Sequence, residues 1–149
     1  MLLEDDADLR GEIAHYLELE GNQVQTSGSI SQCLKLVAHQ LPDILIVDRM
    51  LPDGDGIDLV DNIRKKGGRC GVVMFTAKDS FQDRLDGFSS GVDQYLSKPV
   101  RLQELSAVVK AVGWRLQLDT HWRLVLQTWE LKAPSGEVIR LTSQEAGFL

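Results

Sequence analysis

The amino-acid sequence predicts an α/β fold in which helices cover both faces of a parallel β-sheet. Short apolar runs alternate with helix-period segments through residue 112, giving five strand–helix repeats. Two of the runs, residues 44–47 and 72–75, are apolar at every position, which is typical of strands covered on both faces. The length of 149 residues suits one domain of about 100–150 residues with a short extension.

The first half of this pattern contains two strands and two helices. Leu2 and Leu3 predict a short first strand, and residues 23–27 predict a weak second strand. Ser29, with Gln32 three residues later, forms a capping-box pattern that opens the second helix. The apolar faces of the two helices comprise Leu9, Ile13, Tyr16 and Leu17 in the first, and Ile30, Leu34, Val37 and Leu41 in the second.

The second half contains three more strands, each followed by a helix. The runs at residues 44–47 and 72–75 predict the third and fourth strands, and Tyr95 with Leu96 predicts the fifth. A loop with proline and glycine at residues 52–56 precedes the third helix. The apolar faces of these helices comprise Ile57, Val60 and Ile63, then Leu85 and Phe88 in a short and weakly marked helix, and finally Leu102, Leu105, Val109 and Val112.

Charge and aromatic content change near the end of this pattern. Residues 1–112 hold 12 Lys and Arg against 18 Asp and Glu, whereas residues 113–149 hold four of each, so the net charge of −6 lies in the first part. This balance argues against binding of nucleic-acid phosphates by the first part. All three tryptophans follow residue 113. We therefore place a domain boundary near residues 112–121.

Composition also bears on the environment of the protein. Cys33 and Cys70 have no paired spacing, so we expect neither a disulfide framework nor a zinc site. No apolar run is long enough to cross a bilayer, and no charged-then-apolar leader opens the chain. We expect a soluble, cytoplasmic protein without a membrane partner.

Polar side chains gather where the predicted strands end. Glu4 and Asp5 follow the first strand, and Asp48 follows the third. Thr76 follows the fourth strand, and Lys98 follows the fifth. In such sheets polar ligands bind beyond the carboxyl ends of the strands. Carboxylates from two neighbouring strands can hold a hard divalent cation, and magnesium suits best because it tolerates a few carboxylates together with water and phosphate oxygens.

These residue types also suit phosphoryl transfer. A carboxylate can act as the nucleophile and form an acyl phosphate. A lysine can neutralise a phosphoryl group, and a threonine hydroxyl can hydrogen-bond to one of its oxygens. Structural roles stay open beside these: Asp48 as a capping or turn residue, and Glu4 with Asp5 as a solvated acidic turn. Asp6 is expected to cap the first helix.

Four strings of the sequence point to a known family. LLEDD, DILIVDRMLPDGDG, VVMFTA and DQYLSKP resemble the receiver domain of two-component response regulators, in order and at the expected spacing. The resemblance covers residues 1 to about 112. It implies a flavodoxin-like (βα)5 fold, a doubly wound parallel sheet with strand order 2-1-3-4-5. The strand that begins the chain is shorter than in most receivers.

The resemblance also implies a role for each residue at the site. Asp48 resembles the phosphoacceptor, which takes its phosphoryl group from a sensor histidine kinase. Asp5 and Asp48 would bind Mg²⁺ directly, Glu4 directly or through water, and Met50 through its backbone carbonyl. The protein would catalyse only its own phosphorylation and dephosphorylation, and would not be a turnover enzyme.

Three further residues resemble the parts that respond to phosphorylation. Thr76 resembles the switch hydroxyl, and Lys98 would pair with the phosphoryl group. Tyr95 resembles the aromatic residue that changes rotamer with Thr76, although half-buried packing is its structural alternative. The bond between Lys98 and Pro99 is expected to be cis, since a cis bond is least costly before proline.

The tail carries a second resemblance. Residues 122–149 are similar to the start of the winged-helix DNA-binding domain of OmpR/PhoB-type regulators, with a turn at residues 134–136 and a capping box at Thr142 and Glu145. This gives a receiver domain at 1–112, a linker at 113–121 and a partial winged-helix domain at 122–149. We expect a fragment of a longer regulator that binds DNA, and no DNA binding by this chain.

A homodimer is also implied, through the fourth helix, fifth strand and fifth helix of the receiver. Arg84, Asp93 and Glu104 fit the charges used there, whereas Gln94 and Val108 depart from them.

Three other functions are weighed. A magnesium-dependent phosphohydrolase with an aspartyl nucleophile would carry an acid two residues later, where this chain has Met50. A flavin carrier would need a Ser/Thr/Gly-rich loop in place of the acidic residues 4–6. A stand-alone receiver that signals by protein contact alone stays the alternative.

Overall fold

The computed structural model describes residues 1–77, 85–86, 89–117, 123–125, 130–132 and 138–140. The chain divides into two compact units, Met1–Gly113 and Trp114–Leu149. The first unit carries the α/β fold, and the described part of the second forms a small antiparallel sheet.

Five parallel strands form the sheet of the first unit, in the order β2-β1-β3-β6-β7. Among the five predicted strands this is the order 2-1-3-4-5, so the predicted flavodoxin-like fold is confirmed. Because the order reverses between β1 and β3, the carboxyl ends of these strands border the position where ligands bind in such folds. The bounds are Thr26–Ser27 (β2), Leu2–Leu3 (β1), Ile44–Asp48 (β3), Gly71–Thr76 (β6) and Gln94–Ser97 (β7).

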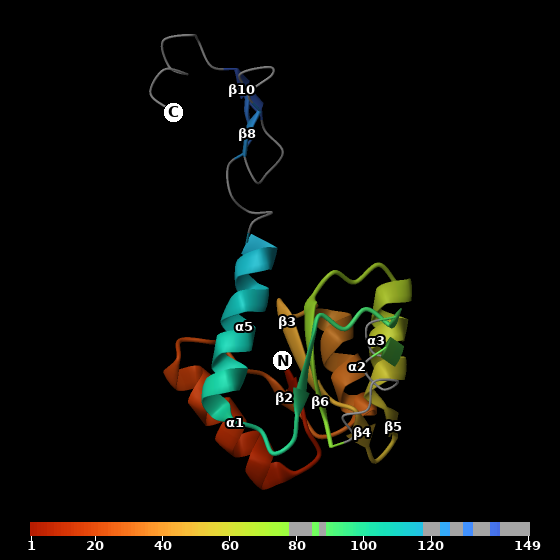
Figure 1. Ribbon diagram of the computed structural model, residues 1–149. Helices are drawn as coiled ribbons and strands as arrows, with labels where there is room; N and C mark the ends of the chain where they lie inside the picture. The colour runs from red at the N-terminus through yellow and green to blue at the C-terminus, as the bar shows by residue number, and fades with distance from the viewer. Residues whose placement is uncertain (78–84, 87–88, 118–122, 126–129, 133–137, 141–149) are drawn as a thin grey trace. The chain divides into compact units, whose positions relative to one another are not determined.

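Helices cover both faces of this sheet (Figure 1). α1 (Ala7–Leu19) and α5 (Leu102–Gln117) lie over one face, and α2 (Ile30–His39) and α3 (Gly56–Lys65) lie over the other. The helix predicted around Leu85 and Phe88 falls largely outside the described residues. The apolar faces predicted for the other helices supply buried side chains from α1 (Ile13, Leu17), α3 (Ile57, Val60, Ile63) and α5 (Leu105, Val109, Val112).

The core is deepest where β3 pairs with β6. The paired residues run from Ile44 opposite Gly71 to Asp48 opposite Phe75. Every residue of β6 is buried, as are residues 45–48 of β3. Burial on both faces explains why these strands are apolar at every position until each ends on a polar residue.

The apolar face predicted for α2 is partly wrong. Cys33 is its fully buried side chain, whereas Leu34 is 37% exposed. Leu41 is 40% exposed and lies beyond the helix, because the chain turns to an extended conformation at Gln40. The predicted cap is confirmed, since Ser29 Oγ accepts a hydrogen bond from Gln32 N at 3.2 Å. The second strand is also shorter than predicted, at two residues.

Two features of the structure were not predicted. A small antiparallel hairpin, β4 (Met50–Leu51) with β5 (Gly54–Asp55), fills the loop between β3 and α3. In addition, α5 continues to Gln117, so residues 113–117 of the predicted linker are helical.

Beyond α5, the described part of the second unit is a three-stranded sheet of β8 (Arg123–Val125), β9 (Glu130–Lys132) and β10 (Val138–Arg140). β9 pairs antiparallel with both neighbours. The predicted turn at residues 134–136 and the capping box of Thr142 and Glu145 lie outside the described residues. Within the described parts of the chain, no helix is both long and apolar enough to span a bilayer.

Candidate functional site

The carboxyl ends of four strands bring the predicted site residues to one edge of the sheet. Asp48 ends β3 and Thr76 ends β6, while Glu4 follows β1 and Lys98 follows β7. Two backbone hydrogen bonds continue the ladder past the strands: Arg49 N donates to Phe75 O, and Lys98 N donates to Thr76 O, both at 2.9 Å. The parallel registers of the strands thus fix the backbone positions from which these side chains project.

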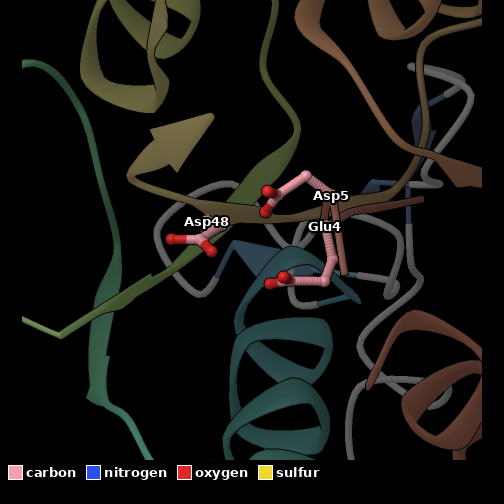
Figure 2. Close-up of side chains that lie close together, drawn as sticks. All are labelled: Glu4, Asp5 and Asp48. Carbon is pink, nitrogen blue, oxygen red and sulfur yellow. The ribbon is translucent and has the colours of Figure 1, made fainter. Parts of the chain in front are cut away.

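Three carboxylates converge at this edge (Figure 2). One oxygen each from Glu4, Asp5 and Asp48 lies within 4.8 Å of the others. Glu4 and Asp48 are buried, with 1% and 3% of their surface exposed, whereas Asp5 is exposed. The cluster therefore has a buried floor and an open side.

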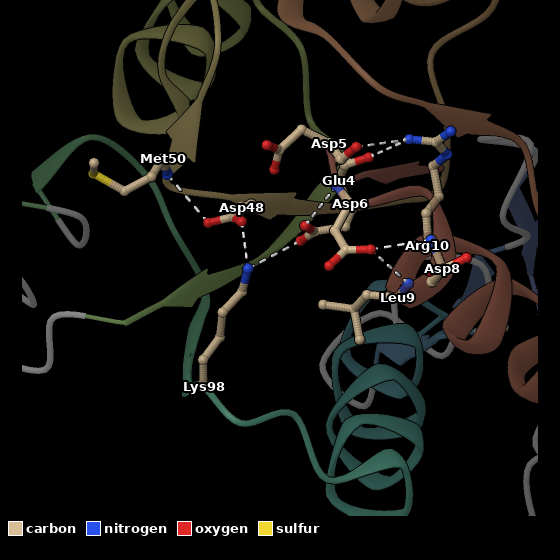
Figure 3. Close-up of polar contacts among 9 residues, drawn as sticks. All are labelled: Glu4, Asp5, Asp6, Asp8, Leu9, Arg10, Asp48, Met50 and Lys98. Carbon is tan, nitrogen blue, oxygen red and sulfur yellow. Dashed lines mark hydrogen bonds and ion pairs between the residues drawn. The ribbon is translucent and has the colours of Figure 1, made fainter.

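Lys98 bonds to the two buried carboxylates of this cluster (Figure 3). Its Nζ lies 2.5 Å from Asp48 Oδ2 and 3.2 Å from Glu4 Oε2. The other oxygen of Asp48, Oδ1, accepts a hydrogen bond from Met50 N at 3.1 Å. Both oxygens of the central carboxylate are thus held, one by a cation and one by the backbone. The bond between Lys98 and Pro99 is cis, as predicted.

Burial sets the electrostatics of the cluster. It raises the pKa of Glu4 to about 7, although a hydrogen bond from Asp6 N opposes the shift and Asp48 adds to it. Burial acts to lower the pKa of Lys98, but its bonds to Asp48 and Glu4 outweigh this and raise that pKa. Crowded carboxylates thus favour binding of a cation.

The start of α1 holds the acidic turn in place. Asp6 is the N-cap, and its Oδ1 accepts hydrogen bonds from Asp8 N and Leu9 N, which confirms its predicted role. Arg10 Nη1 donates to the carbonyls of Glu4 and Asp5 at 2.7 and 3.4 Å. This arginine was not predicted at the site, because a single arginine near a helix start carries no sequence pattern that identifies its partners.

The loop after β3 is braced by its own acidic residues. Asp55 caps α3 by accepting from Ile57 N at 2.9 Å, and its Oδ2 lies 3.4 Å from Arg49 Nε. Gly56 N donates to Arg49 O at 2.7 Å. A Cβ at Gly56 would lie 2.5 Å from Asp48 O, so only glycine fits there. The Met50 side chain is 61% exposed.

The remaining predicted residues occupy the strands beside the cluster. Thr76 is buried at the end of β6, and Tyr95 is half-buried in β7, where it pairs with Met74. Their switch roles stay predictions. Asp93, predicted at a dimer interface, is used within the domain: its Oδ2 accepts from Val72 N at 2.7 Å and lies 3.3 Å from Arg64 Nη2.

The potential ligand atoms at the site suit a hard divalent cation. All three side chains that approach one another are carboxylates, and oxygen is the ligand atom that magnesium and calcium prefer. No cysteine or histidine belongs to this described cluster, which argues against a site built for zinc.

Comparison with known proteins defines the class. Residues 1–110 match the response regulator receiver domain, and the chain belongs to this family, as the sequence predicted. The family is not a classical enzyme family.

Particular relatives are transcriptional regulators. The chain is 30% identical over 158 residues to the probable transcriptional regulatory protein TcrX of Mycobacterium tuberculosis, covering 100% of this chain and 68% of TcrX. It is 34% identical over 152 residues to the transcriptional regulatory protein CpxR of Klebsiella pneumoniae, covering 99% and 63%. The response regulator MprA of Mycobacterium leprae is 32% identical over 119 residues, covering 80% and 52%. The chain thus spans about half to two thirds of these relatives.

Solved structures agree with this assignment. The receiver domain of Francisella response regulator 1452 superposes with a TM-score of 0.74 at 29% identity, covering 76% of this chain and 94% of that one. A two-component response regulator from Clostridium difficile gives 0.73 at 29% identity, covering 77% and 94%.

Proposed function

We propose that this chain is the phosphorylation-controlled part of a two-component regulator, and that Asp48 accepts the phosphoryl group. The observation that carries this is the convergence of Glu4, Asp5 and Asp48 within 4.8 Å, with Lys98 bonded to Asp48. A sensor histidine kinase is the proposed donor.

The proposed reaction needs little beyond positioning. An Asp48 carboxylate oxygen forms a bond to phosphorus while the bond from phosphorus to the donor's imidazole nitrogen breaks, and the electron pair leaves with that nitrogen. Lys98 offsets negative charge that gathers on the phosphoryl oxygens. Met50 N orients the carboxylate through its hydrogen bond to Oδ1. The chain would catalyse only its own phosphorylation and dephosphorylation.

Magnesium is the proposed cofactor. Glu4, Asp5 and Asp48 would hold it through carboxylate oxygens and Met50 through its backbone carbonyl. Bound there, it supplies positive charge that neutralises the carboxylates and the incoming phosphoryl oxygens.

The proposed output is a change of state in the domain. Thr76 would turn toward the phosphoryl group and Tyr95 would follow, so that phosphorylation shifts an equilibrium between two forms. We further propose that residues 122–149 begin a winged-helix domain, so that the longer regulator binds DNA and this chain does not. A receiver that acts by protein contact alone is the alternative.

Intact-mass spectrometry tests the proposal. We expect the chain, incubated with acetyl phosphate and Mg²⁺, to gain a single phosphoryl group, and to gain none in EDTA. Asp48→Asn removes the nucleophile and abolishes the adduct. Asp58→Asn changes an exposed carboxylate on α3 and serves as the matched control that keeps it. An adduct that persists in Asp48→Asn, or folded wild-type protein that gains none, contradicts the assignment.

A further inference from the structure

We propose that Asp53 is a positioning residue for the metal site: it anchors the loop that carries Met50 to the first turn of α2. This inference rests on the proposed function, because it concerns the magnesium site assigned there. The Asp53 carboxylate bonds to the backbone of α2 and not to the acidic cluster, so it acts through the β4–β5 hairpin.

The anchor consists of two hydrogen bonds between segments far apart in the sequence. Asp53 Oδ1 accepts from Ile30 N and Oδ2 accepts from Ser31 N, both at 3.0 Å. These N–H groups belong to the first turn of α2, where helix geometry provides no internal acceptor. Ser29, the helix's own cap, accepts from Gln32 N instead. Asp53 and Ser29 therefore divide the capping of this helix between them.

The charge of Asp53 suits this position. A helix N-terminus carries partial positive charge, which favours a carboxylate over a neutral acceptor. The hydrogen bonds from Ser31 N and Ile30 N lower the pKa of Asp53 below its ordinary value. The anchor is thus present throughout the neutral range.

The β4–β5 hairpin connects Asp53 with Met50 at the proposed metal site. Met50 pairs with Asp55 and Leu51 with Gly54, and Asp53 lies in the turn between these strands. Gly54 packs against α2 as well, since a Cβ there would lie 3.0 Å from Ile30 Cδ1. At the other end of the hairpin, Met50 N bonds to Asp48 Oδ1. A short antiparallel pair fixed at its turn leaves the Met50 backbone little freedom.

This arrangement has a functional consequence. Met50 is the one proposed metal ligand supplied by a loop backbone, and its side chain is exposed and offers no anchor of its own. When a group that orients a metal ligand without binding the metal is removed, the affinity for the metal typically falls 10- to 100-fold. Because the hairpin keeps its strand pairing without Asp53, we expect removal of Asp53 to weaken Mg²⁺ binding about 10-fold, near the lower end of this range.

An NMR titration of the full chain with MgCl2 tests this inference, with thermal stability measured beside it. Asp53→Ala removes both bonds to α2, and we expect it to weaken Mg²⁺ binding about 10-fold. Asp53→Asn keeps one acceptor oxygen, and we expect an intermediate loss. The amide resonance of Met50 should shift in both variants before metal is added.

Two control variants separate positioning from stability and from charge. Ser29→Ala removes the other cap of α2 and lowers its stability without touching the hairpin. Asp58→Asn removes the same unit of charge from an exposed site on α3. We expect both to bind Mg²⁺ as the wild type does.

Each result has a distinct meaning. If Asp53→Ala binds Mg²⁺ as tightly as the wild type, or if Ser29→Ala weakens binding equally, Asp53 has only a structural role and this inference is wrong. If the folded wild type shows no saturable Mg²⁺ binding, the proposed metal site is wrong as well.

Discussion

At the scale of single residues, the site is defined by an imbalance of charge. Glu4, Asp5 and Asp48 face one lysine, Lys98, so full ionisation would leave two negative charges in excess. Two of these carboxylates are buried, where desolvation penalises the ionised form. A divalent cation would balance the charge, and this is the physical reason to expect metal binding at this site.

The raised pKa of Glu4 predicts how the metal-free protein responds to pH. Folded Glu4 holds a proton up to about pH 7, whereas the unfolded chain releases it near 4.5, so the folded state binds more protons between these values. The free energy of unfolding should therefore fall as pH rises from 5 to 8, with about 2–3 kcal/mol attributable to the buried Glu4.

Urea denaturation in EDTA at a series of pH values measures this slope. Residue 4 cannot ionise in Glu4→Gln, so the free energy of unfolding of this variant should change less with pH over the same range. The variant should also be more stable than the wild type at pH 8. Glu12→Gln, at an exposed position of α1, should keep the wild-type slope. Equal slopes in wild type and Glu4→Gln would show that Glu4 ionises normally in the fold.

At the scale of elements, the connection from β3 to α3 is the most constrained part of the site. Asp55 caps the helix, Arg49 O accepts from Gly56 N, and the hairpin occupies the residues between. The chain returns so closely on itself that Gly56 lies against the backbone of Asp48, the proposed phosphoacceptor. Site geometry and helix capping thus depend on the same few residues.

We therefore predict opposite effects on stability for two glycine substitutions. Gly56→Ala places a methyl group 2.5 Å from Asp48 O, so backbone must shift; we expect a loss of about 1–3 kcal/mol and slower phosphorylation. Gly11→Ala lies in α1 with nothing within 4 Å of the new methyl group, and it should stabilise by about 0.5–1 kcal/mol. Chemical denaturation compares them; a neutral Gly56→Ala would show that the turn can relax.

At the scale of the whole molecule, the first unit has its own core. The buried apolar residues include side chains from β1, β3, β6 and all four described helices, and the family match ends at residue 110. α5 completes this core with Leu105, Val109 and Val112, and then continues past the unit boundary to Gln117. Beyond α5, the described residues of the second unit form a separate sheet, which agrees with the proposal that a further domain begins there.

Truncation tests where the receiver domain ends. A chain ending at Gln117 keeps all of α5, so its melting temperature should match that of the full chain's first transition within about 2 °C. A chain ending at Val108 loses buried Val109 and Val112, which removes about 3–6 kcal/mol. Circular dichroism melting distinguishes them, and an unfolded 1–117 chain would show that residues 118–149 are needed for stability.

The class of fold, the order of the strand–helix repeats and the residues at the strand ends could all be predicted from the amino-acid sequence. Period and two-sided burial are local properties, so the apolar runs of β3 and β6 and the faces of α1, α3 and α5 could be predicted. The parallel fold then placed Glu4, Asp5, Asp48 and Lys98 at one edge. The family resemblance supplied their proposed roles.

The contacts that support these residues became visible in the folded chain alone. Asp53 reaches α2 through hydrogen bonds that depend on how separate elements pack, and Arg10 folds back from α1 onto the carbonyls of the acidic turn. The burial of Cys33 in place of Leu34 likewise depends on which side of α2 packs against the rest of the domain. Docking angles and long-range hydrogen bonds have no local sequence period, which is why these features could not be predicted from the pattern of residues.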